Sequence, residues 1–177
     1  DWSSDVCSSD LVTNTGTILS KIIKGYTKAE YQHVSISLDK KINKMYSFGR
    51  KNPYIAFIGG FVKEHPNKGT FKRFKNTTCR IIEYSISDKQ YNEIESLIEE
   101  MYKNRNKLKF NTIGLFAVAI KKKYQPEDTF YCAEFVKYIV EKSKLRIDLP
   151  EIVEPENFKD IEGREIYRGL FREYLNQ

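Results

Sequence analysis

The sequence predicts a single α+β domain in which an antiparallel sheet packs against helices. Three observations support this class. Polar and apolar residues alternate from His33 to Leu38, the period of a strand, whereas apolar residues in Ser87–Arg105 and Asp128–Ser143 recur at helical spacing. The 177 residues fit one hydrophobic core, and neither a linker nor an internal repeat divides them. A composition of 40% hydrophobic and 31% charged residues excludes a disordered chain.

The first eleven residues differ from the rest of the chain. Asp1–Leu11 contain three Asp, four Ser and the single Trp but no Lys or Arg, and they resemble a translated sequencing adaptor. We therefore expect residues 1–11 to be a poorly ordered, non-native tail, with a natural polar tail as the alternative, and residues 12–177 to form the domain. This also removes Cys7 from the candidate site. The whole chain has a net charge of +6, and without the three acidic residues of this tail the charge is +9.

Five segments are predicted strands because they alternate or are rich in β-branched and aromatic residues: His33–Leu38, Lys44–Phe48, Thr70–Phe74, Cys79–Ile86 and Glu165–Phe171. The first two form a hairpin across Asp39–Lys41, and Thr70–Phe74 is expected to pair with Cys79–Ile86. Four glycines and two prolines indicate that Gly49–Gly69 is mostly loop.

Four segments are predicted helices: Thr15–Tyr26, Ser87–Arg105, Ile113–Lys122 and Asp128–Ser143. In the second of these, Ser87 and Gln90 have the spacing of a capping box. The third is short and almost wholly apolar, so we expect it to be buried.

Cys132 and His33 are the residues most suited to covalent chemistry. Cys132 lies in the first turn of a predicted helix, where unpaired backbone N–H groups and the helix dipole favour a thiolate and can bind an oxyanion. A cysteine nucleophile needs a general base, and His33 at the start of a strand is the candidate, because His65 lies in a polar loop. The alternatives are a buried structural cysteine and an ordinary strand-end histidine.

The order of these motifs resembles a known family. His33-Val-Ser-Ile-Ser37 precedes Tyr131-Cys-Ala-Glu-Phe-Val136, with Tyr46-Ser-Phe-Gly-Arg50, Gly59-Gly-Phe61 and Glu64 between them. This arrangement resembles the circularly permuted NlpC/P60 group of papain-like proteins, which includes YiiX-like bacterial proteins and enzymes similar to lecithin–retinol acyltransferase. The resemblance extends over Thr13–Tyr174. It implies a permuted papain-like fold, in which the histidine strand precedes the cysteine helix.

The resemblance also implies a catalytic set. Cys132 would be the nucleophile, His33 the base, and a polar residue on the following strand would orient the imidazole. Tyr46 and Ser47 are available there, and alignment through the hairpin favours Ser47, which cannot stabilise an imidazolium as a carboxylate does. Arg50 is a candidate contact for a substrate carboxylate, or else a solvated arginine.

For Tyr131 and Glu134, which lie near Cys132 in the sequence, the expected roles are less specific. Tyr131 is a candidate for lining the site, with ordinary packing as the alternative. We expect Glu134 to face solvent or to pair with a lysine.

The implied function is a thiol hydrolase or acyltransferase that forms an acyl-cysteine intermediate. Amide or ester bonds of cell-wall-type peptides or of lipids are the substrate classes, with no cofactor or metal. A catalytically inactive papain-like binding domain is one alternative, since no acidic partner of His33 is evident. Another is a basic surface that binds anionic lipid or nucleic acid through Lys121–Lys123 and Lys72–Lys75, although no nucleic-acid motif is present and we expect no nucleic-acid partner.

Cysteine usage and hydropathy bear on location. The cysteines have neither metal spacing nor the pattern of a disulfide framework, which indicates a reducing compartment, and we expect a cytoplasmic protein. The longest apolar run, Ile113–Ile120, has eight residues, whereas a membrane-spanning helix needs about 20. Contact with a membrane would therefore be peripheral.

Overall fold

The computed structural model describes residues 7–14, 29–39 and 41–176 of the chain. Their centre is a six-stranded antiparallel sheet with the strand order β4-β3-β2-β1-β5-β8. The strands are β1 (Cys7–Asn14), β2 (His33–Ser37), β3 (Met45–Asn52), β4 (Ile55–Glu64), β5 (Thr78–Ser85) and β8 (Arg164–Leu170). A separate two-stranded parallel pair is formed by β6 (Lys109–Phe110) and β7 (Thr129–Phe130). This confirms the mixed α+β class with an antiparallel sheet.

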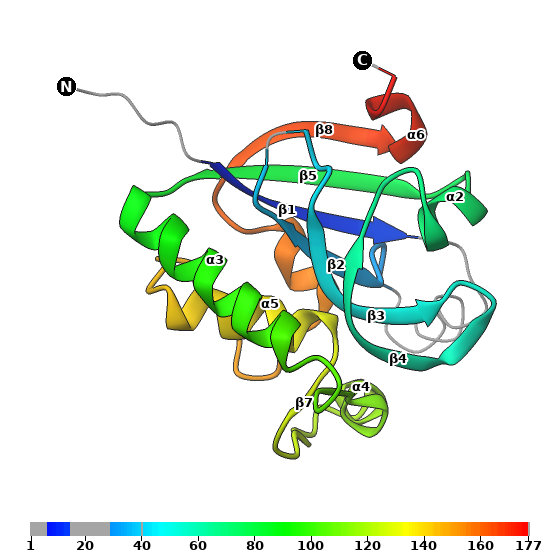
Figure 1. Ribbon diagram of the computed structural model, residues 1–177, viewed down its shortest axis with the longest axis vertical. Coiled ribbons are helices and arrows are strands. Elements are labelled where there is room, and N and C mark those ends of the chain that lie inside the picture. The colour runs from blue at the N-terminus through cyan, green and yellow to red at the C-terminus, as the bar shows by residue number, and fades with distance from the viewer. Residues whose placement is uncertain (1–6, 15–28, 40, 177) are drawn as a thin grey trace.

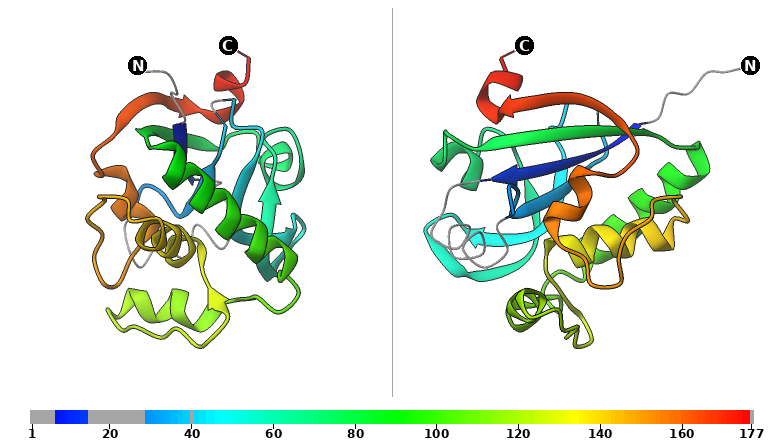
Figure 2. Two further views of the ribbon diagram at one scale, coloured as in Figure 1. Left: turned by 60° about the vertical axis from the view of Figure 1, so that its left-hand side comes forward. Right: turned by 180° about the vertical axis from the view of Figure 1, so that it is seen from behind.

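Two helices cover one side of the sheet, as Figures 1 and 2 show: α3 (Asp88–Lys103) and α5 (Cys132–Lys142). Helix α4 (Thr112–Ala119) lies beyond β7 at one end of the molecule, and the short helices α2 (Gly69–Arg73) and α6 (Phe171–Tyr174) lie near the opposite end of the sheet (Figure 1). A 3₁₀ turn spans Pro155–Lys159. None of the helices in the described part of the chain has both the length and the apolar character that crossing a membrane demands.

The main core lies between the sheet and its two covering helices. Its fully buried members come from both layers: Val34, Ile36, Phe48, Ile94, Ile98, Phe135 and Ile139. A second, smaller cluster joins Met45 and Cys79 of the sheet to Phe71 of α2 and Phe171 of α6. The two phenylalanine rings meet edge to face with their centroids 5.0 Å apart, so they fix the short helices against each other.

Several predicted elements are confirmed. The β2–β3 hairpin and strands β5 and β8 are present, and β8 pairs with β5 at the edge of the sheet. Helix α3 begins with the predicted capping box, in which the Gln90 backbone donates to the Ser87 hydroxyl and the Ser87 backbone donates to Oε1 of Gln90. The predicted helix at Thr15–Tyr26 lies outside the described residues.

The expectation that the N-terminal segment is poorly ordered is wrong for Cys7–Leu11, because these residues form most of β1. This strand lies between β2 and β5 and pairs with both, from Cys7 opposite Ser85 to Asn14 opposite Thr78 on the β5 side. A sheet ladder joins backbone groups that every residue except proline possesses, so a polar segment can occupy a central position. Composition alone therefore misjudged the folded domain, whose sheet includes residues before Val12.

Two further expectations in the first half are wrong. Gly49–Gly69 is not mostly loop, since it contains the last residues of β3 and the whole of β4. Its glycines mark places where other groups come close. A Cβ on Gly59 would lie 2.8–3.0 Å from the Phe110 side chain. Thr70–Phe74 is not a strand, since most of it belongs to α2, and β5 pairs with β1 and β8 instead.

Helix α4 exists but is not wholly buried. Gly114 and Val118 are buried, whereas Ile113, Phe116 and Ile120 are exposed. An almost uniformly apolar segment has no periodicity to indicate which face packs inward. The predicted helix at Asp128–Ser143 is confirmed with a later start, at Cys132, because Thr129 and Phe130 form β7.

Candidate active site

The local structure around Cys132 places its thiol at a helix N-terminus. The parallel pairing of β7 with β6 fixes the approach to α5, and the helix begins at Cys132. Phe135, Val136 and Ile139 are fully buried against the sheet and hold this helix in place. Cys132 itself is 4% exposed. Because the first N–H groups of a helix have no acceptor within it, they are donors at the position where an oxyanion would form beside the thiol.

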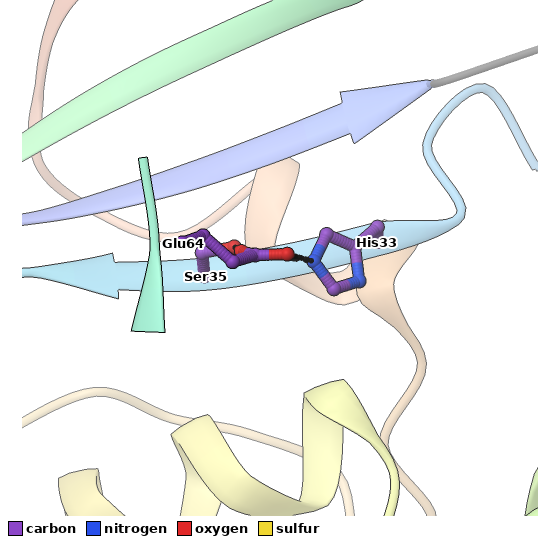
Figure 3. Close-up of polar contacts among 3 residues, drawn as sticks. All are labelled: His33, Ser35 and Glu64. Carbon is purple, nitrogen blue, oxygen red and sulfur yellow. Dashed lines mark hydrogen bonds and ion pairs between the residues drawn. The ribbon is translucent and has the colours of Figure 1, made fainter. Parts of the chain in front are cut away.

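His33 begins β2, and its ring takes part in a hydrogen-bonded cluster with Glu64 and Ser35 (Figure 3). Nε2 of His33 lies 3.1 Å from Oε1 and 3.3 Å from Oε2 of Glu64. The Ser35 hydroxyl lies 3.2 Å from the same nitrogen and donates to Oε2 of Glu64 at 2.5 Å. The carboxylate thus binds one ring nitrogen and fixes the orientation of the imidazole.

Glu64 reaches His33 although their strands are not neighbours, because β3 lies between β2 and β4. The register pairs Ser37 with Met45 and Met45 with Glu64, so these three side chains share one face of the sheet. Ser35 and His33 follow on that face at intervals of two residues. The Glu64 side chain extends along β3 toward them.

Gly49 of β3 leaves space for the Glu64 side chain to reach across β3 to His33. A Cβ at this position would lie 3.2 Å from Oγ of Ser47, 3.3 Å from Oε1 of Glu64 and 3.4 Å from Cε1 of His33. A Cβ would therefore be tight against the Ser47 hydroxyl and the Glu64 carboxylate and in ordinary van der Waals contact with the imidazole. The glycine that we took as the start of a loop therefore belongs to the site.

The environment favours the charged forms of both partners. Burial alone would lower the pKa of His33, but the charge of Glu64 and the hydrogen bonds to Cys132 and Glu64 outweigh it and raise that pKa from 6.5 to about 10. Burial would raise the pKa of Glu64, yet the charge of His33 and the hydrogen-bonding groups around the carboxylate bring it below its ordinary value. The site therefore holds an imidazolium–carboxylate pair at neutral pH.

Cys132 and His33 lie near each other, since interaction with the Cys132 side chain is among the influences that raise the pKa of His33. Since Glu64 binds Nε2, the other ring nitrogen, Nδ1, is left for the thiol. Figure 3 shows that this nitrogen points away from Glu64.

Cys79 has a different environment. It is fully buried in the second core cluster, and burial raises the pKa of its thiol to about 12. A thiol of this kind remains protonated at neutral pH and is a poor nucleophile.

The expectation that Ser47 orients His33 requires a correction. The ring nitrogen that faces away from Cys132 binds Glu64 and Ser35, whereas Oγ of Ser47 is buried without a hydrogen bond of normal geometry. Ser47 lies close enough to Glu64 to help lower the pKa of the carboxylate, so it acts on the carboxylate rather than on the imidazole. The acidic partner of His33, which is absent from β3, is Glu64 at the end of β4.

Sequence reasoning noted Glu64 only as one piece of the family resemblance. Treating residues 49–69 as loop concealed the strand register that carries its carboxylate to His33. One signal was available: Glu64 is the single acidic residue of Ile55–Glu64, a segment that is apolar and glycine-rich apart from Lys63.

The predicted substrate-contact residues occupy different surroundings. Tyr46 stacks on Phe61 with the ring centroids 6.3 Å apart and alternates with Ser47, so it does not orient His33. Arg50 lies over the Phe74 ring at 5.9 Å and lines a groove that also contains Glu64. Arg50 therefore borders the site at the Glu64 end.

Tyr131 and Glu134, on either side of Cys132 in the sequence, have structural partners. Tyr131 is buried and its hydroxyl donates to the backbone carbonyl of Val153 at 2.8 Å, which corresponds to the packing alternative. Glu134 neither faces solvent nor pairs with a lysine: it is buried and accepts from the backbone N–H of Tyr131 at 3.0 Å and from Asn111 at 3.2–3.3 Å. Burial raises the pKa of Glu134 to about 7.

Comparison with protein-family models, with curated proteins and with solved structures finds no match to this chain. Within the described residues, His, Cys, Asp and Glu side chains form no group of three that could hold a metal ion. The chemical interpretation of the site therefore depends on the geometry of Cys132, His33 and Glu64.

Proposed function

We propose that the protein is a thiol hydrolase or acyltransferase that works through an acyl-cysteine intermediate. One observation carries the proposal: the Glu64 carboxylate binds the imidazole of His33, and the Cys132 side chain, at the start of α5, is near enough to raise the pKa of that imidazole. A nucleophile, a base and an orienting carboxylate in this order are the components of nucleophilic acyl transfer.

The chemistry follows from the charges of these groups. Imidazolium at His33 stabilises a thiolate at Cys132, whose sulfur attacks the carbonyl carbon of an amide or ester. The backbone N–H groups at the start of α5 stabilise the resulting oxyanion. When the carbon–nitrogen or carbon–oxygen bond breaks, His33 gives its proton to the leaving group, and a thioester on Cys132 remains.

The second half of the reaction uses the same residues. Neutral His33 takes a proton from water, or from the hydroxyl or amine of an acceptor, as that nucleophile attacks the thioester. The carbon–sulfur bond breaks, and the acyl group leaves as an acid or as a new ester or amide. The thiolate and imidazolium are restored, with Glu64 retaining its negative charge throughout.

The proposal extends to the fold, for which a permuted papain-like (NlpC/P60) domain is our interpretation. Its support is the motif order in the sequence, with the histidine strand before the cysteine helix, together with a helix that begins at Cys132 and packs on the sheet. Cell-wall-type peptides and lipids remain the two substrate classes proposed from this resemblance.

An inactive binding domain was the alternative suggested by the absence of an acidic partner for His33. Glu64 removes that argument, because a carboxylate 3.1 Å from Nε2 stabilises an imidazolium where a serine hydroxyl does not. We therefore favour the enzyme.

A test is to incubate the protein with a panel of activated acyl esters and peptide amides and to measure the intact mass. We expect an added mass equal to the acyl group, mapped to Cys132, and its loss in Cys132→Ala. Cys79→Ala is the matched control and should retain acylation. Acylation that persists at the wild-type rate in Cys132→Ala would refute the proposal.

A further inference from the structure

The outer face of α4 is an exposed apolar surface that the candidate active site does not explain. Ile113, Phe116 and Ile120 are 64%, 44% and 67% exposed. Their spacing places them on one side of the helix, opposite the buried Gly114 and Val118. Neighbouring exposed side chains of this size are a recognised mark of an interaction surface.

This surface is held in a fixed orientation by Asn111. Its side chain accepts from the backbone N–H of Gly114 at 2.8 Å, donates to the carbonyl of Tyr124 at 2.7 Å and donates to Glu134. A Cβ on Gly114 would lie 2.1–2.5 Å from atoms of Asn111 and Tyr124, so the helix lies directly on this amide. The apolar face is therefore presented outward by a buried network.

Basic residues precede and follow the helix in the chain. No acidic residue occurs from Met101 to Pro126, and the segment contains seven basic ones, all exposed: Lys103, Arg105, Lys107, Lys109, Lys121, Lys122 and Lys123. The chain thus has basic residues before and after an apolar helix. Within this set Lys123 forms an ion pair with Glu151, with a nitrogen–oxygen distance of 3.3 Å.

We propose that α4 is an interfacial helix that docks on an anionic lipid surface. The side chains of Ile113, Phe116 and Ile120 enter the boundary between headgroups and acyl chains, and the flanking lysines and arginine contact lipid phosphates and carboxylates. Charge complementarity favours this occupant: an apolar face whose flanking chain segments from Met101 to Pro126 carry basic and no acidic residues fits a surface that is apolar below and negatively charged at its boundary. The eight residues of α4 are too few to cross a bilayer, so the proposed contact is with its surface.

The position of α4 links this surface to the site. Asn111, the residue that caps α4, binds Glu134, two residues after Cys132 in the first turn of α5. Docking would therefore bring Cys132 close to lipid esters or amides and make lipids the preferred substrate class. This consequence rests on the proposed function, whereas the docking itself does not.

The test is sedimentation of the full chain with vesicles of phosphatidylcholine alone or mixed with phosphatidylglycerol. We expect binding to the mixed vesicles that weakens as salt increases, and at least about tenfold weaker partitioning of the Ile113→Ser/Phe116→Ser/Ile120→Ser variant. The matched control, Tyr54→Ser/Ile55→Ser, alters exposed apolar residues of the β3–β4 turn region and should bind as the wild type does.

A charge comparison completes the design. Lys121→Gln/Lys122→Gln/Lys123→Gln should lose binding, whereas Lys68→Gln/Lys72→Gln/Lys75→Gln, of equal charge change around α2, should retain most of it. Cys132→Ala should bind normally, which separates docking from catalysis. Equal binding to the two vesicle types, undiminished binding of the triple-serine variant, or a change only in self-association would overturn the proposal.

A fluorescence measurement gives an independent readout. In a Trp2→Phe background, Phe116→Trp is the single tryptophan of the chain. We expect its emission to shift to shorter wavelength with the anionic vesicles and to remain unchanged with phosphatidylcholine alone. An unchanged spectrum with both would contradict insertion of α4.

Discussion

Replacing Glu64 with glutamine removes the charge on which the proposed chemistry depends. The substitution keeps the shape of the side chain and an oxygen that accepts from Nε2 of His33. The charge of Glu64 is the largest of the effects that raise the pKa of His33, and burial opposes it. We therefore expect the pKa of His33 to fall from about 10 to near or below its ordinary 6.5 in Glu64→Gln.

The same change affects stability with a defined pH dependence. The side chains of His33 and Glu64 are only 18% and 12% exposed, and breaking a buried ion pair costs about 3–5 kcal/mol. Since glutamine retains one hydrogen bond, we expect a loss of about 3 kcal/mol in the free energy of unfolding.

The pH dependence of this stability difference follows from the pKa shifts of His33 and Glu64. The raised pKa of His33 gives stability that is fully present below pH 6.5 and is lost as pH rises toward 10. The lowered pKa of Glu64 gives stability that is present above pH 4.5 and is lost as pH falls. The free energy of unfolding of the wild type should therefore exceed that of Glu64→Gln by the largest amount between pH 4.5 and pH 6.5.

The assay is an NMR titration of the imidazole signals, combined with denaturant unfolding at several pH values. Only two histidines are present, so His65 serves as the internal reference. A pKa of His33 that is the same in wild type and Glu64→Gln, with equal stability at pH 6, would refute the ion pair and the orienting role of Glu64.

Three further substitutions test parts of the site. Gly49→Val should displace the Glu64 carboxylate and lower acylation at least about tenfold, measured as the rate of acyl transfer from an activated ester, and an unchanged rate would contradict the close approach at Gly49. Ser47→Ala should lower that rate less than about threefold, since the hydroxyl does not bind the imidazole. Glu134 has a raised pKa of about 7, so it gives stability at pH 4.5 that is lost as pH rises through 7. Unfolding measurements should show that this decline is smaller in Glu134→Gln.

The elements that sequence predicts well have strong local signals. Helix α3 combines a capping box with an apolar stripe, and β2 alternates cleanly, so each is specified by its own residues. Cys132 and His33 were identified because their residue types and positions have a chemical meaning before any fold is known.

The failures concern relations between distant segments. Strand β5 lies between β1 and β8. This order is set by backbone hydrogen bonds, for which the side chains of a strand carry no clear signal. The glycines of β3 and β4 read as turn signals, yet their role is to admit Phe110 and Glu64. The residue that orients His33 is identified only when the β3–β4 register is known, because its carboxylate crosses an intervening strand.

The most direct measurement for the central claim is the rate of alkylation of each cysteine by iodoacetamide at pH 6, determined by peptide mass spectrometry. We predict that Cys132 reacts much faster than Cys79, whose pKa is raised to about 12 by burial, and that His33→Ala strongly lowers the rate at Cys132 while the rate at Cys79 stays the same. If Cys79 reacts first, or if the rate at Cys132 is unchanged in His33→Ala, then Cys132 is not a nucleophile activated by His33.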